Sequence, residues 1–367
     1  MKKTRWYEAP LWAGMDLFAW LRLLVRNRLA VSPSRWPMAA SITLFAACNT
    51  ALRWVQNLRF GRRIARVEIP PEVVFIVGHW RTGTTMLHEL LALDPGNRCP
   101  TTYESLSPNH FLISEPWVRR WLPFLLPRQR PMDNMRVSFD RPQEDEAALC
   151  SMGAPSPFLT VAFPNRPRQY PRYGDLEQLT PRELQRWQRA MRRFLQQLLF
   201  KRPGRIVLKS PQHTFRLKVL GNMFPQAGFI HLVRDPYVLF PSTVHFWKTM
   251  YQTYGLQRPH LRGLDDFVFD TLLAMDQKVG EARQVLDPAR FYDLRYEDLV
   301  RDPVEAVRAI YAQFQWPGFA AAEPAFKQYA RRSQRYQTNR YENLSPEVRQ
   351  QIARRWEPYF TRYGYPM

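Results

Sequence analysis

The residues between Gly78 and Thr85 have the types and spacing of a phosphate-binding loop. The apolar run at residues 73–77 predicts a fully buried strand that Gly78 ends, and Gly83 follows five residues later. An amphipathic helix is predicted to begin at Thr84. In such a strand, loop and helix start, free N–H groups and the positive helix end converge on an anion. The plainer alternative is a glycine-bounded turn with no special purpose.

The loop departs from the nucleoside-triphosphate motif G-x-x-x-x-G-K-[ST], whose lysine reaches the β- and γ-phosphates. Thr84 replaces that lysine here, and the cation lies within the loop, at Arg81. The loop is therefore poorly suited to a triphosphate with metal, and no metal site is predicted. It suits a 5′-phosphate that carries one further anionic group. The predicted binding residues are Gly78, His79, Trp80, Arg81, Thr82, Gly83, Thr84 and Thr85.

Two further cations follow predicted strands. Lys209 ends the short strand 205–209, where an ordinary surface lysine is the alternative reading. Arg234 ends the strand 228–233, and Ser242 lies two turns into the helix that follows. An arginine at a strand end offers a planar fork of donors for a phosphate.

Glu104 is the candidate general base. We expect a strand to begin at Arg98 and to carry Glu104 at its carboxyl end, on the same sheet edge as Arg81, where ligands of open α/β sheets bind. A cap for the following helix explains Glu104 about as well. Glu144 and Glu146 are sufficiently explained as acids in the first turn of another helix, and are the next candidates for the base.

The order of elements predicts an α/β fold of P-loop type. With a last strand at residues 290–294 and helices between the strands, we expect three layers, αβα, around a central parallel sheet. Residues 67–367 are predicted to form this domain, and residues 1–66 a separate N-terminal helical region.

The N-terminal region predicts a helical hairpin. Residues 11–29 alternate apolar side chains with arginines, and residues 36–52 carry no charge. The hairpin lies either in a membrane interface or against the catalytic domain, and a single transmembrane anchor is less favoured. The chain is expected in the cytoplasm, and the interfacial alternative would make it a peripheral membrane protein.

Composition narrows the partners. The 367 residues include 53 Lys+Arg against 32 Asp+Glu, a net charge of +21, which favours anionic partners although a basic solvated surface explains much of it. The three cysteines have no metal-ligand spacing and fit a reducing compartment. No nucleic-acid-binding motif accompanies the charge.

Taken together, these motifs resemble the PAPS-dependent sulfotransferases. The resemblance covers about residues 73–360 and is nearest to the bacterial branch with an Arg-type loop, which is related to the tyrosylprotein sulfotransferases. The segments that carry it are Gly78 to Thr85, Leu208-Lys209-Ser210-Pro211, Phe224 to Pro236 with Ser242 eight residues after Arg234, and Tyr296 to Pro303.

The resemblance implies a fold, a donor and roles for these residues. The loop would bind the 5′-phosphosulfate of PAPS, Arg234 and Ser242 its 3′-phosphate, and Lys209 would lie near the transferring sulfuryl group. Glu104 lies where the tyrosylprotein branch has its catalytic acid, so the catalytic residues are expected to be Arg81, Glu104 and Lys209. Residues 333–340 resemble a late loop that closes on the cofactor, which adds Asn339 and Arg340. The catalytic histidine of the cytosolic branch is not assigned to His88 or His110.

The expected reaction is in-line transfer to an acceptor hydroxyl of a lipid, glycolipid or carbohydrate, without metal or nucleic acid. Two alternatives remain: a P-loop nucleotide kinase, and a non-catalytic basic protein that binds membranes or nucleic acid.

Overall fold

The structure, a computed structural model, describes residues 10–126, 129, 132, 135, 137–333 and 344–367. These residues form two compact units. Unit 1 comprises the described parts of residues 1–70, 100–203 and 249–261, and unit 2 those of residues 71–99, 204–248 and 262–367. The predicted division into residues 1–66 and 67–367 stays a prediction.

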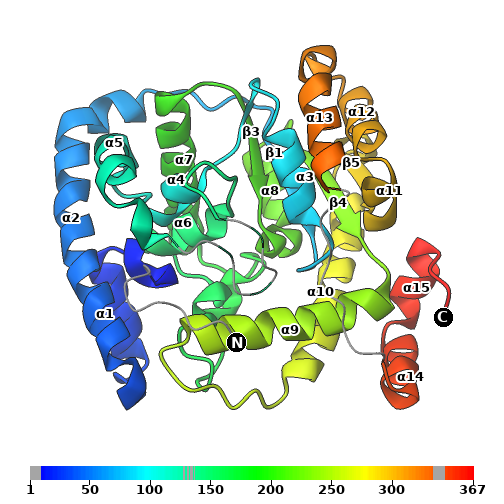
Figure 1. Cartoon of the computed structure of the whole chain (residues 1–367), viewed down its shortest axis with the longest axis horizontal. Coiled ribbons are helices and arrows are strands. Elements are labelled where there is room, and N and C mark those ends of the chain that lie inside the picture. The colour runs from blue at the N-terminus through cyan, green and yellow to red at the C-terminus, as the bar shows by residue number, and fades with distance from the viewer. Residues whose placement is uncertain (1–9, 127–128, 130–131, 133–134, 136, 334–343) are drawn as a thin grey trace. The chain divides into compact units, whose positions relative to one another are not determined.

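A five-stranded parallel sheet forms the centre of unit 2 (Figure 1). Its spatial order is β2 (Asn97–Arg98), β3 (Arg205–Lys209), β1 (Val74–Gly78), β4 (Gly228–Val233) and β5 (Phe291–Arg295). Because all neighbours run parallel, the carboxyl ends of β3, β1 and β4 share one sheet edge. The residues that follow these three strands are therefore brought close together, as ligand sites of such sheets require.

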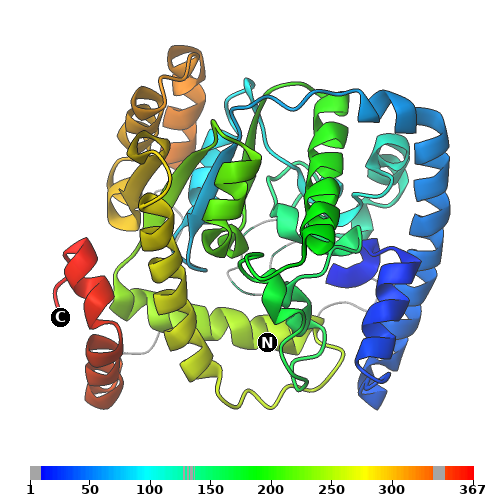
Figure 2. The same ribbon diagram turned by 180° about the vertical axis from the view of Figure 1, so that it is seen from behind.

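Helices cover both faces of this sheet. On one face, α3 (Thr84–Leu91), α12 (Pro303–Gln313) and α13 (Phe319–Ser333) bury Ile76 and Ile230 in a common apolar cluster. On the other face, Phe75 stacks on Phe229 with ring centroids 5.7 Å apart. The elements on this second face are η6 (Pro211–Phe215), α8 (Leu217–Met223) and α10 (Leu264–Arg283), which contact one another. Figure 2 shows the sheet from this side. The predicted three-layer αβα fold is confirmed.

Further helices connect and extend this core. They are α9 (Pro236–Tyr254), α11 (Tyr296–Arg301), α14 (Pro346–Arg355) and α15 (Glu357–Tyr363). Asp235 caps the start of α9, because the Tyr237 N–H donates to its carboxylate over 2.8 Å. After β3 the chain forms the 3₁₀ turn η6 and then α8, since Ser210 and Pro211 initiate a tight turn.

Unit 1 is helical among the residues the structure describes. Its helices are α1 (Leu17–Arg26), α2 (Trp36–Ala65), α4 (Thr102–Leu106), α5 (Phe111–Trp121), α6 (Asp145–Ser151) and α7 (Pro181–Lys201). Helices α1 and α2 run antiparallel: the Leu17 N–H donates to Thr50 and the Trp20 indole to Thr43, over 2.9 and 2.8 Å. We call residues 17–65 the N-terminal hairpin. None of the described helices is both long and apolar enough to cross a bilayer.

The strand predicted from Arg98 to Glu104 is wrong. Strand β2 ends at Arg98, and Glu104 is the third residue of α4. Pro100 has no N–H to continue a ladder, and the Thr101 side chain caps the helix instead. The pattern Thr101-Thr102-Tyr103-Glu104 is a capping box, so local hydrogen bonding decided against the strand.

Because β1 and β4 approach closely at Gly78, a side chain at this position should lower the stability of the fold. Its φ is +137°, and an added Cβ would lie 2.5 Å from the Leu232 carbonyl oxygen. We expect Gly78→Ala to lower the free energy of unfolding by about 3 kcal/mol through backbone strain and overpacking. Gly263→Ala is the matched control: its φ is +70°, nothing lies within 4 Å of the added Cβ, and the expected cost is about 1 kcal/mol. Urea unfolding measures both, and equal losses would contradict the predicted clash.

Candidate active site

The loop after β1 is held by hydrogen bonds to Thr214 of η6 and by one within the loop itself. The Gly78 N–H donates to the Thr214 hydroxyl over 2.8 Å, and that hydroxyl donates to the Gly78 carbonyl over 3.1 Å. Within the loop, the Thr82 hydroxyl donates to the His79 carbonyl over 2.8 Å. The sequence analysis did not find Thr214, whose position in η6 gives no signal in its own neighbourhood.

Two residues of the loop have left-handed backbone conformations. Gly83 has a φ of +96°, and a Cβ there would lie 2.3 Å from the Tyr296 ring. Arg81 has a φ of +74°, which an L-residue adopts only at a cost. Helix α3 begins directly after Gly83, so its first N–H groups face the loop without intrahelical partners. This backbone shape, followed by a helix start, is compatible with an anion bound at the loop.

Arg81, Arg234 and Ser242 form one connected cluster in unit 2. The Arg81 Nε donates to the Ser242 hydroxyl over 3.1 Å, and an Arg234 Nη donates to the Arg81 carbonyl over 2.8 Å. The Arg234 guanidinium lies over the Tyr296 ring, 4.1 Å from its centroid. The structure therefore joins the predicted loop cation to both residues predicted for a second phosphate.

Lys209 lies beside the start of α3. It pairs with Ile76 in the register of β3 and β1, and its Nζ is 3.4 Å from the Thr85 hydroxyl. The side chain is buried, with 2% of its surface exposed. Burial, and secondly the charge of Lys209, lowers the pKa of His88 to about 3. A buried ammonium beside the N-terminus of α3 makes this corner strongly attractive to anions.

The side chains of His79 and Trp80 are buried and uncharged, and they contribute packing to the loop. His79 is buried, its Nδ1 lies 3.1 Å from the Trp80 carbonyl, and burial lowers its pKa to about 3. The imidazole is therefore neutral at physiological pH. The Trp80 ring packs edge-on against Trp247 with centroids 4.9 Å apart, which anchors the loop on α9.

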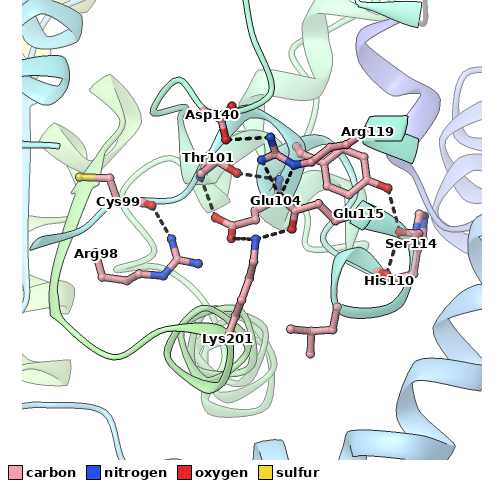
Figure 3. Close-up of polar contacts among 12 residues, drawn as sticks. Arg98, Cys99, Thr101, Glu104, His110, Ser114, Glu115, Arg119, Asp140 and Lys201 are labelled. Carbon is pink, nitrogen blue, oxygen red and sulfur yellow. Dashed lines mark hydrogen bonds and ion pairs between the residues drawn. The ribbon is translucent and has the colours of Figure 1, made fainter. Parts of the chain in front are cut away.

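Glu104 belongs to unit 1, where it serves two structural interactions (Figure 3). Its Oε2 accepts from the Thr101 N–H over 2.8 Å, which completes the capping box. Its Oε1 accepts from the Lys201 Nζ over 2.8 Å, and the same ammonium also pairs with Glu115. The alternative reading of Glu104 as a helix cap is therefore realised in the structure.

The ion pairs continue beyond Lys201. An Arg119 Nη lies 2.6 Å from the Glu115 carboxylate, and the other lies 2.7 Å from Asp140. Lys201 and Glu115 were not found from the sequence, because a lysine in the last turn of α7 reads as an ordinary dipole partner.

The two other acids considered for the base have different surroundings. Glu144 is the N-terminal cap residue of α6 and makes no side-chain cap hydrogen bond. The Glu146 carboxylate accepts a hydrogen bond from the Ser156 hydroxyl. The predicted residues Asn339 and Arg340 lie outside the described residues.

This arrangement of cations, hydroxyls and helix start is what a protein needs to hold phosphate and sulfate esters. Residues 71–321 match the sequence profile of the sulfotransferase family. The chain therefore belongs to the sulfotransferase family, as the resemblance implied.

Particular relatives agree with this assignment. The chain is 49% identical over 364 residues to a protein of Mycobacterium tuberculosis, and equally to one of Mycobacterium bovis. Both are named omega-hydroxy-beta-dihydromenaquinone-9 sulfotransferase Stf3, and the match covers 99% of this chain and 93% of theirs.

Two solved structures share the fold. Sulfotransferase STF9 of Mycobacterium avium has a TM-score of 0.67 at 17% identity, covering 95% of this chain and 96% of that one. Sulfotransferase STF1 of Mycobacterium tuberculosis has a TM-score of 0.62 at 18% identity, covering 93% and 90%.

The burial of His79 predicts a pH dependence of stability. Its pKa in the folded chain, about 3, is below the ordinary 6.5, so the unfolded chain binds more protons between these values. His79 therefore favours folding above pH 6.5, and the benefit is lost as the pH falls below it, on the order of 1 kcal/mol per pH unit. We expect His79→Gln to reduce the slope of unfolding free energy against pH on the acid side. Exposed His260→Gln is the control, and identical slopes for the two variants would contradict the prediction.

Proposed function

We propose that this chain transfers the sulfuryl group of PAPS to a hydroxyl of a membrane lipid. The observation that carries the acceptor class is the 49% identity, over 99% of the chain, to proteins named for a hydroxylated dihydromenaquinone. A lipid with a terminal hydroxyl on a long apolar chain is thus favoured over a carbohydrate.

The residues of unit 2 fit PAPS as donor. The loop from Gly78 to Thr85 would hold the 5′-phosphosulfate. Its two glycines stand where a Cβ would clash with neighbouring residues, so they allow the tight backbone path of the loop, and the helix start offers N–H donors. Arg234 and Ser242 would hold the 3′-phosphate, and Asn339 and Arg340 are proposed to add further contacts. When bound, PAPS supplies the activated sulfuryl group. No metal is included, because Thr84 replaces the lysine of the triphosphate loop.

Two cations are proposed to stabilise the charge that develops during transfer. Arg81 lies in the loop itself, and Lys209 lies beside Thr85 at the start of α3. Both are fixed before the donor binds, one through Ser242 and one through burial, so little reorganisation is needed.

Glu104 is proposed as the base that accepts the proton of the acceptor hydroxyl. Both of its oxygens already accept hydrogen bonds, so a substrate hydroxyl must share or displace one partner. Lys201 is the partner that can yield, because Glu115 offers its ammonium a second carboxylate. Glu144 and Glu146 are the next candidates if Glu104 serves only the helix cap.

A lipid acceptor also favours work at a membrane surface. We propose a cytoplasmic protein with peripheral membrane contact and without a nucleic-acid partner. The alternatives of a nucleotide kinase and of a non-catalytic binding protein gain no support from the family or the relatives.

Transfer of labelled sulfate from PAPS to a hydroxylated dihydromenaquinone tests the proposal directly. We expect Arg81→Ala to lower kcat about 10²- to 10³-fold, since one preorganised charge donor is lost. Arg234→Ala should chiefly raise the KM for PAPS, because it removes a phosphate contact. Label found only in polymeric glycan would exclude the lipid acceptor, and magnesium-dependent turnover of ATP would favour the kinase.

A substitution that keeps the helix cap isolates the charge of Glu104. Glutamine also fits the third position of a capping box, so Glu104→Gln preserves α4 while it removes the proposed base. We expect kcat to fall about 10²- to 10⁴-fold with affinity for 3′,5′-adenosine bisphosphate unchanged. Glu183→Gln is the matched control, because Glu183 has the same place in the capping box of α7. Normal turnover by the Glu104 variant would assign the base elsewhere.

A further inference from the structure

One whole face of α2 is apolar and exposed. Between residues 36 and 58, ten of the eleven exposed positions carry apolar side chains, and the eleventh is Asn57. The ten are Trp36, Pro37, Ala40, Leu44, Ala47, Cys48, Ala51, Trp54, Val55 and Leu58. At 100° per residue they fall opposite the buried positions Ile42, Ala46 and Asn49. A helix on the surface of a water-soluble protein normally has charged and polar residues there.

The buried polar residues of α2 lie on the opposite side and form hydrogen bonds within unit 1. The Asn49 amide donates to the Met15 carbonyl over 3.0 Å, and the Gln56 amide donates to the Asn109 carbonyl over 3.1 Å. Helices α5 and α7 pack on α2 and lie to one side of it (Figures 1 and 2). One side of α2 is thus fixed to protein, so this helix can lie on an apolar phase but has no reason to cross it.

Helix α1 extends the apolar surface. Phe18, Leu21 and Val25 are exposed at helical spacing, opposite the buried Ala19 and Leu23. Leu29 continues the row. Among the described residues, nine of the seventeen large apolar side chains that are exposed lie between residues 18 and 58. The concentration in one hairpin distinguishes this surface from apolar residues scattered singly.

Charge flanks the apolar surface at both ends. Residues 10–66 contain nine arginines against one acid, Asp16, which is buried and paired with Arg53. Exposed arginines stand at Arg22 and Arg28 near α1, and at Arg59 and Arg62 where the apolar row of α2 ends. Helices that lie in the interface of anionic membranes have this composition, with tryptophan and leucine on one face and arginine beside them.

We infer that the outer face of the N-terminal hairpin docks on an anionic lipid bilayer, with both helices parallel to the membrane plane. The inference rests on the proposed lipid acceptor for its purpose, but its evidence is the hairpin alone. Apolar side chains enter the boundary between headgroups and acyl chains, and the arginines contact lipid phosphates. We assign a bilayer as the occupant because a continuous apolar row with arginines at its ends matches the two layers of a membrane interface, acyl chains beneath anionic headgroups.

Vesicle binding by the full chain tests the inference. The wild-type chain should bind vesicles of phosphatidylcholine with phosphatidylglycerol, and bind less in high salt or to phosphatidylcholine alone. Leu44→Glu and Leu58→Glu should each weaken binding about tenfold or more, because a charge enters the apolar row. Val285→Glu is the matched control, an equally charged change at an exposed apolar residue of unit 2.

Cys48 provides a second measurement without a new cysteine. Cys48 is exposed on the outer face of the N-terminal hairpin, whereas Cys99 and Cys150 are buried. An environment-sensitive fluorophore on Cys48 should shift its emission to the blue when anionic vesicles are added. An unchanged emission together with retained vesicle binding would place the contact elsewhere and overturn the inference.

The remaining outcomes separate this inference from the proposed function. Wild-type chain that sulfates detergent-dispersed acceptor but binds no vesicles refutes the docking surface and leaves the function intact. Vesicle binding without sulfate transfer to any acceptor refutes the proposed function and leaves the docking surface intact. Self-association in lipid-free buffer that Leu44→Glu abolishes, with no binding to vesicles, would identify the face as an interface between two copies.

Discussion

The site of unit 2 depends on one close contact, the approach of the β1 backbone to β4 at Gly78. Without a side chain there, the strand end can turn away from Leu232 and the Thr214 hydroxyl can bind both polar groups of Gly78. That turn fixes where the loop begins, and hence where Arg81 lies relative to Ser242 and Arg234. The position of Arg81 thus depends on the hydrogen bonds that Thr214 makes with the Gly78 backbone.

Much of the fold was predictable because the signals are strong and local. Strands β1, β3 and β4 are short apolar runs. Gly78 and Lys209 end the first two and Arg234 follows the third, and a parallel sheet brings such ends to one edge. The loop cluster was therefore predictable as a group. That the Arg81 side chain meets Ser242 was not, because this contact joins residues 161 positions apart.

The surroundings of Glu104 show where sequence reasoning fails. A capping box and a short strand end compete for the same few residues, and hydrogen bonds between Thr101 and Glu104 decide the outcome. The Glu104 partner Lys201 lies on α7, 97 positions further along the chain, so no local pattern predicts this ion pair. Pairing of this kind is set by packing among helices, which a single sequence does not encode visibly.

The backbone of Arg81 has a consequence for how stability and activity are divided in this chain. A left-handed φ of +74° costs an arginine about 1 kcal/mol that glycine would not lose. Selection for thermodynamic robustness alone would put glycine or asparagine at this position. At Arg81 the loop therefore accepts a backbone conformation that lowers stability, and this conformation places a guanidinium beside Ser242.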